Sequence, residues 1–164
     1  MPPAATEYLE TYLQDHRAGA ETGADLARRL AEENADTPYE PFLARIAEEI
    51  ERDAAILEDV MDRFDVGRPK LKIASAKVTE RLGRLKPNEQ LSGYSPLSRV
   101  LELEGLRAGV QAKLGLWDSL AQLSPYEERL DEAEIAACVA RAETQLEGLR
   151  EQHRMAAREA FAAT

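Results

Sequence analysis

The residues best suited to chemistry in this chain are carboxylates, gathered in the segment EEIERDAAILEDVM at positions 48–61. Carboxylate and imidazole groups are the ligands that manganese and iron commonly take in proteins. The segment contains no histidine, and the whole chain has only two, His16 and His153. A metal site would therefore have to combine this segment with residues that are distant in the sequence.

Both histidines fall near the middle of an apolar helix face when residues are placed about 100° apart. A buried imidazole needs a hydrogen-bonding partner. At the same height in the architecture predicted below, His16 meets Asp53, and His153 meets Glu102 or Glu104. The two levels are about 15–20 Å apart, so the groups form two pairs and do not converge on one ion. We expect two core histidines, each held by a carboxylate; metal ligation or proton transfer is the alternative.

Most acids of the 48–61 segment lie off its apolar face, which predicts a solvated surface, with weak cation binding as the alternative. These acids are Glu48, Glu49, Glu51, Glu58 and Asp59.

Other common chemistries find little support. The single cysteine, Cys138, lies in the apolar stretch IAACVARA, which predicts a buried, inert thiol. The stretch LSGYSPLSR at positions 91–99 could cradle a phosphate, but it lacks the spacing and the lysine of a nucleotide-binding loop. A turn followed by a helix cap at Ser95 explains it fully. No catalytic residue is predicted.

The elements that must position these residues are helices. Apolar residues recur at intervals of three and four, and glycine and proline interrupt the pattern. Asp36 or Thr37 can cap the second helix with Pro38 in its first turn, and Gly67 can end it. Helices are predicted at residues 6–33, 39–64, 71–85, 95–123 and 131–162.

Four of these helices are long, and a connection at about 66–95 separates the first two from the last two. This order predicts a single all-α domain over residues 1–164: a four-helix bundle of two antiparallel hairpins joined by a long crossover that contains an extra short helix. On the first helix, small residues at Gly19 and Gly23 predict close approach by a neighbour. An apolar pocket beside Tyr12 and Trp117 is the alternative.

This plan resembles the ferritin-like superfamily over nearly the whole chain. The closest local likeness is FLARIAEEIERDAAIL at 42–57, which resembles the acid-rich helix of rubrerythrin-type proteins. That family builds a di-metal site from glutamates and two Glu-x-x-His pairs. Here Ile50 stands at the Glu position and Asp53 at the His position, and Arg150 stands three residues before His153. The resemblance therefore implies a diverged bacterial member without the usual ligands. No cofactor is expected, with iron or manganese as the alternative.

The crossover is basic, whereas the chain as a whole has a net charge of −10. A basic amphipathic helix can bind an anionic surface or an acidic protein, or it can lie on the chain's own acidic helices. The overall negative charge argues against nucleic acid as a partner. The basic patch comprises Lys70, Lys72, Lys77, Arg81 and Arg84.

The first residues, MPPAATEYLETYL, have neither the basic region nor the apolar run of a signal peptide. No stretch of the sequence approaches the run of about 18 uncharged apolar residues that a membrane-spanning helix needs. We therefore expect a cytoplasmic protein. We also expect it to form a homodimer, and to be non-catalytic, with a structural, regulatory or binding role. One alternative is a metal-dependent oxidoreductase or metal-storage protein with a non-standard carboxylate/His site. Another is an adaptor that uses the basic crossover.

Overall fold

The computed structural model describes residues 3–67 and 94–162. Within these ranges the chain forms four α-helices, one short 3-10 helix and no strand, which confirms the all-α prediction. The predicted helix at 71–85 lies outside the described residues. The elements are α1 (Pro3–Glu33), α2 (Glu40–Arg63), α4 (Pro96–Leu123), η1 (Ser124–Tyr126) and α5 (Glu132–Ala162).

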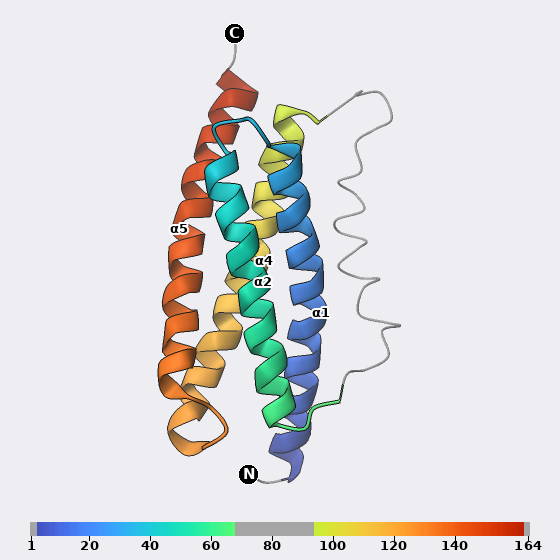
Figure 1. Ribbon diagram of the computed structural model, residues 1–164, viewed down its shortest axis with the longest axis vertical. Coiled ribbons are helices and arrows are strands. Elements are labelled where there is room, and N and C mark those ends of the chain that lie inside the picture. Colours follow the sequence, from blue (N-terminus) through green and yellow to red (C-terminus); the bar gives the residue numbers. More distant parts are fainter. Residues whose placement is uncertain (1–2, 68–93, 163–164) are drawn as a thin grey trace.

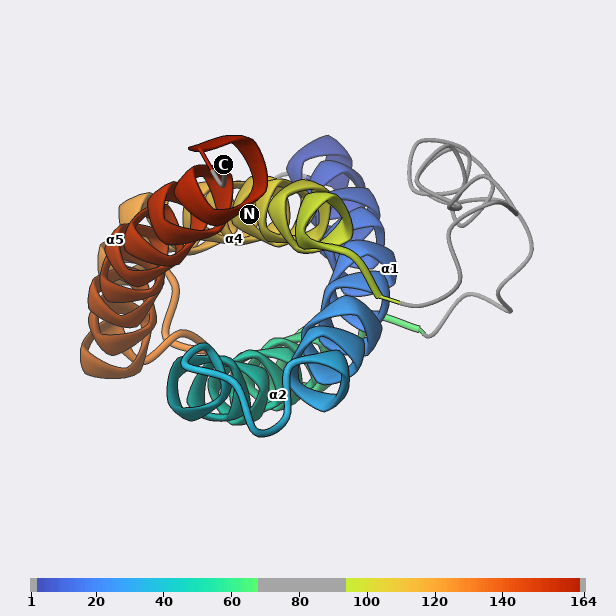
Figure 2. The same ribbon diagram turned by 90° about the horizontal axis from the view of Figure 1, so that it is seen from above.

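All four helices lie along one long axis (Figure 1). Viewed down that axis, α1 lies between α2 and α4, and α5 lies beside α4 (Figure 2). Backbone contacts are extensive between α1 and α2 and between α4 and α5, whereas α2 and α5 make few. The space between α2 and α5 is therefore bridged mainly by side chains. No helix in the described ranges is both long and apolar enough to cross a bilayer.

The helix starts confirm one predicted cap and correct another. Ser95 caps α4 by accepting a hydrogen bond from the backbone N–H of Ser98 at 3.0 Å, as expected for a Ser N-cap. The cap predicted for α2 is wrong. Its N-cap is Tyr39, which makes no side-chain capping bond, and the proline of its first turn is Pro41.

The end of α2 also differs from the prediction. Phe64 is its C-cap, and the left-handed residue that follows is Asp65, with φ of 54°. Gly67 was predicted to take this role. Asp tolerates the left-handed region better than most non-glycine residues do, so the turn closes two residues earlier.

The apolar core consists of two clusters, one at each end of the helices. Along α2 the first cluster ends at Ile50 and the second begins at Leu57. Along α4 the corresponding residues are Val110 and Leu116. A layer of polar side chains separates the two clusters at mid-length, and it is described below.

The packing prediction for Gly19 and Gly23 is wrong. Gly19 is exposed, and a Cβ added at Gly19 or Gly23 would meet nothing within 4 Å. Close approach occurs instead on α5, where a Cβ at Gly148 would lie 2.3 Å from the Phe42 ring of α2. At the end of α5, Phe161 is 68% exposed.

Candidate functional site

The polar layer is built from residues that occupy core positions. Asp53, Lys113 and Gln145 each stand on the buried side of a helix, between apolar residues spaced by three or four. On α4, for example, the stripe reads Leu103, Leu106, Val110, Lys113, Trp117 and Leu120. The helical pattern therefore directs these polar side chains toward one another at mid-length, where water is largely excluded.

Asp53 is the centre of the layer, and its side chain is fully buried, with 0% exposure. Lys113 Nζ donates to Asp53 Oδ2 at 2.5 Å, and Arg141 Nε donates to Oδ1 at 2.6 Å. One carboxylate thus carries two cations, one from α4 and one from α5. Each oxygen has its own charged donor, which meets the requirement that a buried charge be paired.

Gln145 completes the layer. Its Oε1 accepts from Lys113 Nζ at 2.5 Å, and its Nε2 donates to Asp53 Oδ2 at 3.4 Å and to Glu49 Oε2 at 3.1 Å. With Glu49 included, two carboxylates face two cations, and the formal charges cancel. We call the five residues Glu49, Asp53, Lys113, Arg141 and Gln145 the Asp53 cluster.

Burial and charge act in opposite directions on the two cations. Burial lowers the pKa of Lys113 below its ordinary value, although the charge of Asp53 opposes this. Burial would also lower the pKa of Arg141, but the hydrogen bond and the charge of Asp53 raise it above its ordinary value. Lys113 is therefore the more readily deprotonated of the two. It lines neither of the two clefts that are described below.

Cys138 borders the cluster and is fully buried, as predicted. Arg141 Nη2 donates to its Sγ at 3.3 Å. Burial raises the pKa of the thiol to about 11, against a lowering by Arg141. Because the thiolate is the reactive form, this cysteine is poorly suited to act as a nucleophile.

The two predicted histidine pairs have different outcomes. His153 Nε2 lies 2.9 Å from Glu104 Oε1, which confirms that pair, while Glu102 binds Arg29 instead. The pairing of His16 with Asp53 is wrong, because Asp53 is held by Lys113 and Arg141. The His16 ring packs edge-on against Tyr12, with ring centroids 4.6 Å apart.

The side chains at mid-length do not fit the di-metal site that ferritin-like proteins commonly build. Asp53 is the fully buried carboxylate at mid-length, and both of its oxygens are engaged by cations. A divalent ion there would be repelled by Lys113 and Arg141. Within the described ranges, no group of three or more His, Cys, Asp or Glu residues is arranged to hold a metal ion.

Outside this layer, a groove of about 510 Å³ lies between α1 and α2. Alanines line it, and ion pairs such as Arg28–Glu51, at 3.0 Å, flank it. The acids of the 48–61 segment mostly face water, as predicted, although Glu49 and Glu58 are half-buried. The basic patch at Lys70, Lys72, Lys77, Arg81 and Arg84 lies outside the described residues, so its role stays a prediction.

Sequence reasoning identified Asp53 but missed Lys113, Arg141 and Gln145. The signal for Lys113 and Gln145 was present, because both interrupt apolar stripes at core positions. Comparisons of the chain with family models, with curated proteins and with solved structures find no match.

Proposed function

We propose that this chain is a non-catalytic, ferritin-like helical bundle with a structural or binding role. The observation that carries the proposal is the double engagement of Asp53, whose two oxygens are held by Lys113 and Arg141 at 2.5 and 2.6 Å. Asp53 stands where the family would place a metal ligand, and its negative charge is balanced here by protein cations instead of a metal ion.

The proposed topology is two antiparallel hairpins joined by a crossover. Ion pairs between successive helices support it. Arg17 binds Glu58, and Arg28, further along α1, binds Glu51, which is earlier in α2. The connection from Gly67 to Tyr94 starts beside Gln14, in the first half of α1, and ends beside Asn34, just past the last residue of α1.

A metal titration tests the proposal. Protein purified without chelator is analysed for bound elements and then titrated with iron(II) and with manganese(II). We expect no stoichiometric binding, because a divalent ion would have to displace two cations from Asp53. Stoichiometric binding that Asp53→Ala or His153→Ala abolishes would establish the metal-dependent alternative. Asp59→Ala, an exposed acid on the same helix, is the matched control.

A further inference from the structure

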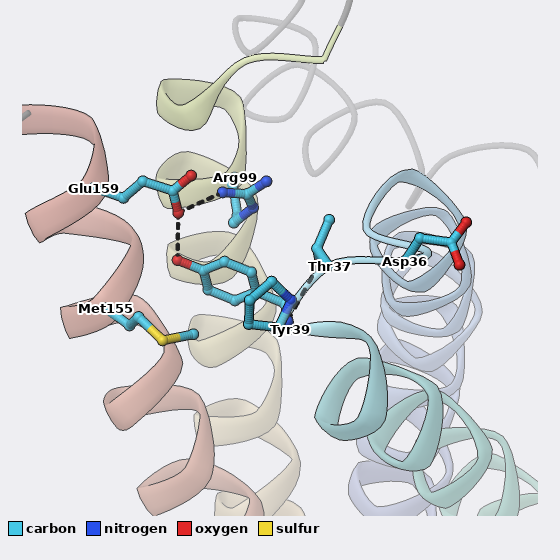
Figure 3. A pocket seen from close by; sticks show the side chains of 7 residues that line it. Asp36, Thr37, Tyr39, Arg99, Met155 and Glu159 are labelled. Atoms are coloured by element: carbon cyan, nitrogen blue, oxygen red, sulfur yellow. Dashed lines mark hydrogen bonds and ion pairs between the residues drawn. The ribbon is translucent and has the colours of Figure 1, made fainter.

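A cleft of about 290 Å³ opens at the end of the bundle where the α1–α2 connection meets the start of α4 and the last turns of α5 (Figure 3). It is remote from the Asp53 cluster. Its walls combine apolar side chains with a single cation and two acids. The lining residues are Asp36, Thr37, Pro38, Tyr39, Arg99, Met155 and Glu159.

Arg99 is the fixed element of this cleft. Its side chain is 9% exposed, and its Nε donates to Asn34 Oδ1 at 2.5 Å. Its guanidinium carbon lies 4.3 Å from the centroid of the Tyr39 ring, which gives a cation–π contact. Asn34 is held in turn by Leu30 O and Tyr94 Oη. The guanidinium is therefore positioned from behind, independently of any anion in front of it.

Glu159 is the anion in front of Arg99. Its Oε2 accepts a hydrogen bond from Arg99 Nη1 at 2.8 Å and another from Tyr39 Oη at 2.8 Å (Figure 3). Unlike Arg99, the Glu159 side chain is 47% exposed. Its carboxylate can leave by rotation into water, without exposing core and without unwinding α5. The two donors would then be free to bind another carboxylate.

We propose that this cleft binds a small monocarboxylate with an apolar body, and that Glu159 occupies the same donors when the ligand is absent. The ligand's carboxylate takes the place of Glu159 on Arg99 and Tyr39. Its body contacts Pro38, the Tyr39 ring and Met155, whose side chain points toward Tyr39 (Figure 3).

The charges around the cleft favour a ligand with one negative charge over a ligand with two. The displaced Glu159 stays close to the ligand, and Asp36 lines the other side of the cleft, with its carboxylate directed away from Arg99 (Figure 3). A dianion such as phosphate would meet these acids with only one guanidinium to compensate. A neutral amide of the same shape would lose the charge-assisted hydrogen bond.

Competition from Glu159 predicts how variants bind. A tethered carboxylate reduces the fraction of molecules that can accept a ligand, and it raises the apparent Kd by the same factor. Glu159→Ala is therefore expected to bind about tenfold more tightly than the parent chain. Arg99→Met is expected to lose binding. Tyr39→Phe, which keeps the ring but loses one donor, is expected to weaken binding severalfold when it is added to Glu159→Ala, where no carboxylate of the chain competes.

The test is an NMR titration of the full chain, with methyl-labelled methionine, against benzoate, benzamide and inorganic phosphate. Three results together would support the proposal. Benzoate shifts the Met155 methyl signal saturably, the apparent Kd is lower in Glu159→Ala, and the shift is absent in Arg99→Met. Glu151→Ala removes another exposed acid of α5 and is expected to behave like the parent chain. Met155→Leu assigns the signal.

No saturable shift in Glu159→Ala would overturn the proposal, as would equal affinity for benzamide or phosphate. The double variant Tyr39→Phe, Glu159→Ala keeps the test decisive if Arg99→Met fails to fold. Because no carboxylate of the chain competes there, benzoate affinity equal to that of Glu159→Ala would contradict the proposed donor pair. The proposed function is tested separately. The metal titration measures binding at the Asp53 cluster, at mid-length, whereas this titration measures binding at the cleft at the end of the bundle.

Discussion

Two of the ionic groups that hold α5 are built with opposite polarity. In the Asp53 cluster the carboxylate is fully buried, and its cations, Lys113 and Arg141, are 15% and 21% exposed. At the end of the bundle the cation, Arg99, is buried, and the carboxylate of Glu159 is about half exposed. The same pair of charges therefore has a different buried partner in each place.

This difference in burial decides which carboxylate can leave its protein donors and be replaced by water or a ligand. A buried carboxylate cannot leave its cations without exposing an unpaired charge to a medium of low dielectric constant, so the Asp53 cluster is fixed. An exposed carboxylate can exchange its protein donors for water at little cost, so Glu159 can be replaced. Burial of one partner or the other thus separates a structural cluster from a binding site.

The largest expected effect follows from removing the buried carboxylate. Asp53→Asn removes the carboxylate that Lys113 and Arg141 both bind and leaves only Glu49, which reaches the layer through Gln145. We expect a loss of about 3–5 kcal/mol in the free energy of unfolding. Urea unfolding followed by circular dichroism measures it. Asp59→Asn, on the solvent side of the same helix, should change stability by less than about 0.5 kcal/mol. A small loss for Asp53→Asn would show that the cations move out to water freely.

The Asp53 result also bears on what a sequence can predict. The apolar spacing located the four long helices and the Ser95 cap, because local periodicity and capping chemistry depend on neighbours in sequence. The spacing also put Asp53 in the core. It could not supply the partner, since Lys113 and Arg141 come from helices 60 and 88 residues away. Long basic side chains reach inward from partly exposed positions, so hydropathy alone classes them as surface.

Glycine gives a second example of this limit. The helix face at Gly19 and Gly23 suggested a close neighbour because small residues permit one. The actual close approach is at Gly148, where the Phe42 ring lies. Small size permits close packing but does not produce it, because the neighbour that fills the space comes from a helix distant in the sequence.

The next largest effect is on the thiol beside the cluster. With its pKa raised to about 11 from an ordinary 9.0, Cys138 should react with a disulfide reagent at least about 100-fold more slowly in the folded chain than when unfolded at pH 8. Because the folded pKa is the higher one, the thiol's contribution to stability is intact below pH 9.0 and is lost as the pH rises through about 11.

Thiol kinetics also sharpen the comparison, because Cys138 reports opening of the Asp53 cluster. Asp53→Asn should accelerate the reaction, whereas Glu159→Gln, at the distant end, should leave the rate unchanged. Equal acceleration by both variants would show that the two ionic groups open together.

A smaller effect tests the packing of α5 on α2 at Gly148 and Phe42, which lie between the two ionic groups along these helices. Gly148→Ala would bring a Cβ within 2.3 Å of Phe42, whereas a Cβ at Gly109, exposed on α4, would meet nothing within 4 Å. Gly109→Ala should stabilise the chain by up to about 1 kcal/mol through helix propensity. Gly148→Ala should lack this gain, and the two should differ by about 1–2 kcal/mol. Repeating the pair in Phe42→Leu should reduce the difference; if it persists, the ring is not its cause.

The smallest effect is expected from the exposed carboxylate. Glu159→Gln should cost less than about 1 kcal/mol, because water replaces the lost partner. The hydrogen bond from Tyr39, together with that from Arg99, lowers the pKa of Glu159 below its ordinary value of 4.5. Its stabilisation is therefore complete above pH 4.5 and is lost as the pH falls through the folded pKa. Urea unfolding at a series of pH values from about 3 to 6 should show a flatter acid limb in Glu159→Gln than in Glu151→Gln. If Glu159→Gln instead costs as much as Asp53→Asn, exposure does not separate the two groups, and the exchange of Glu159 for a ligand loses its physical basis.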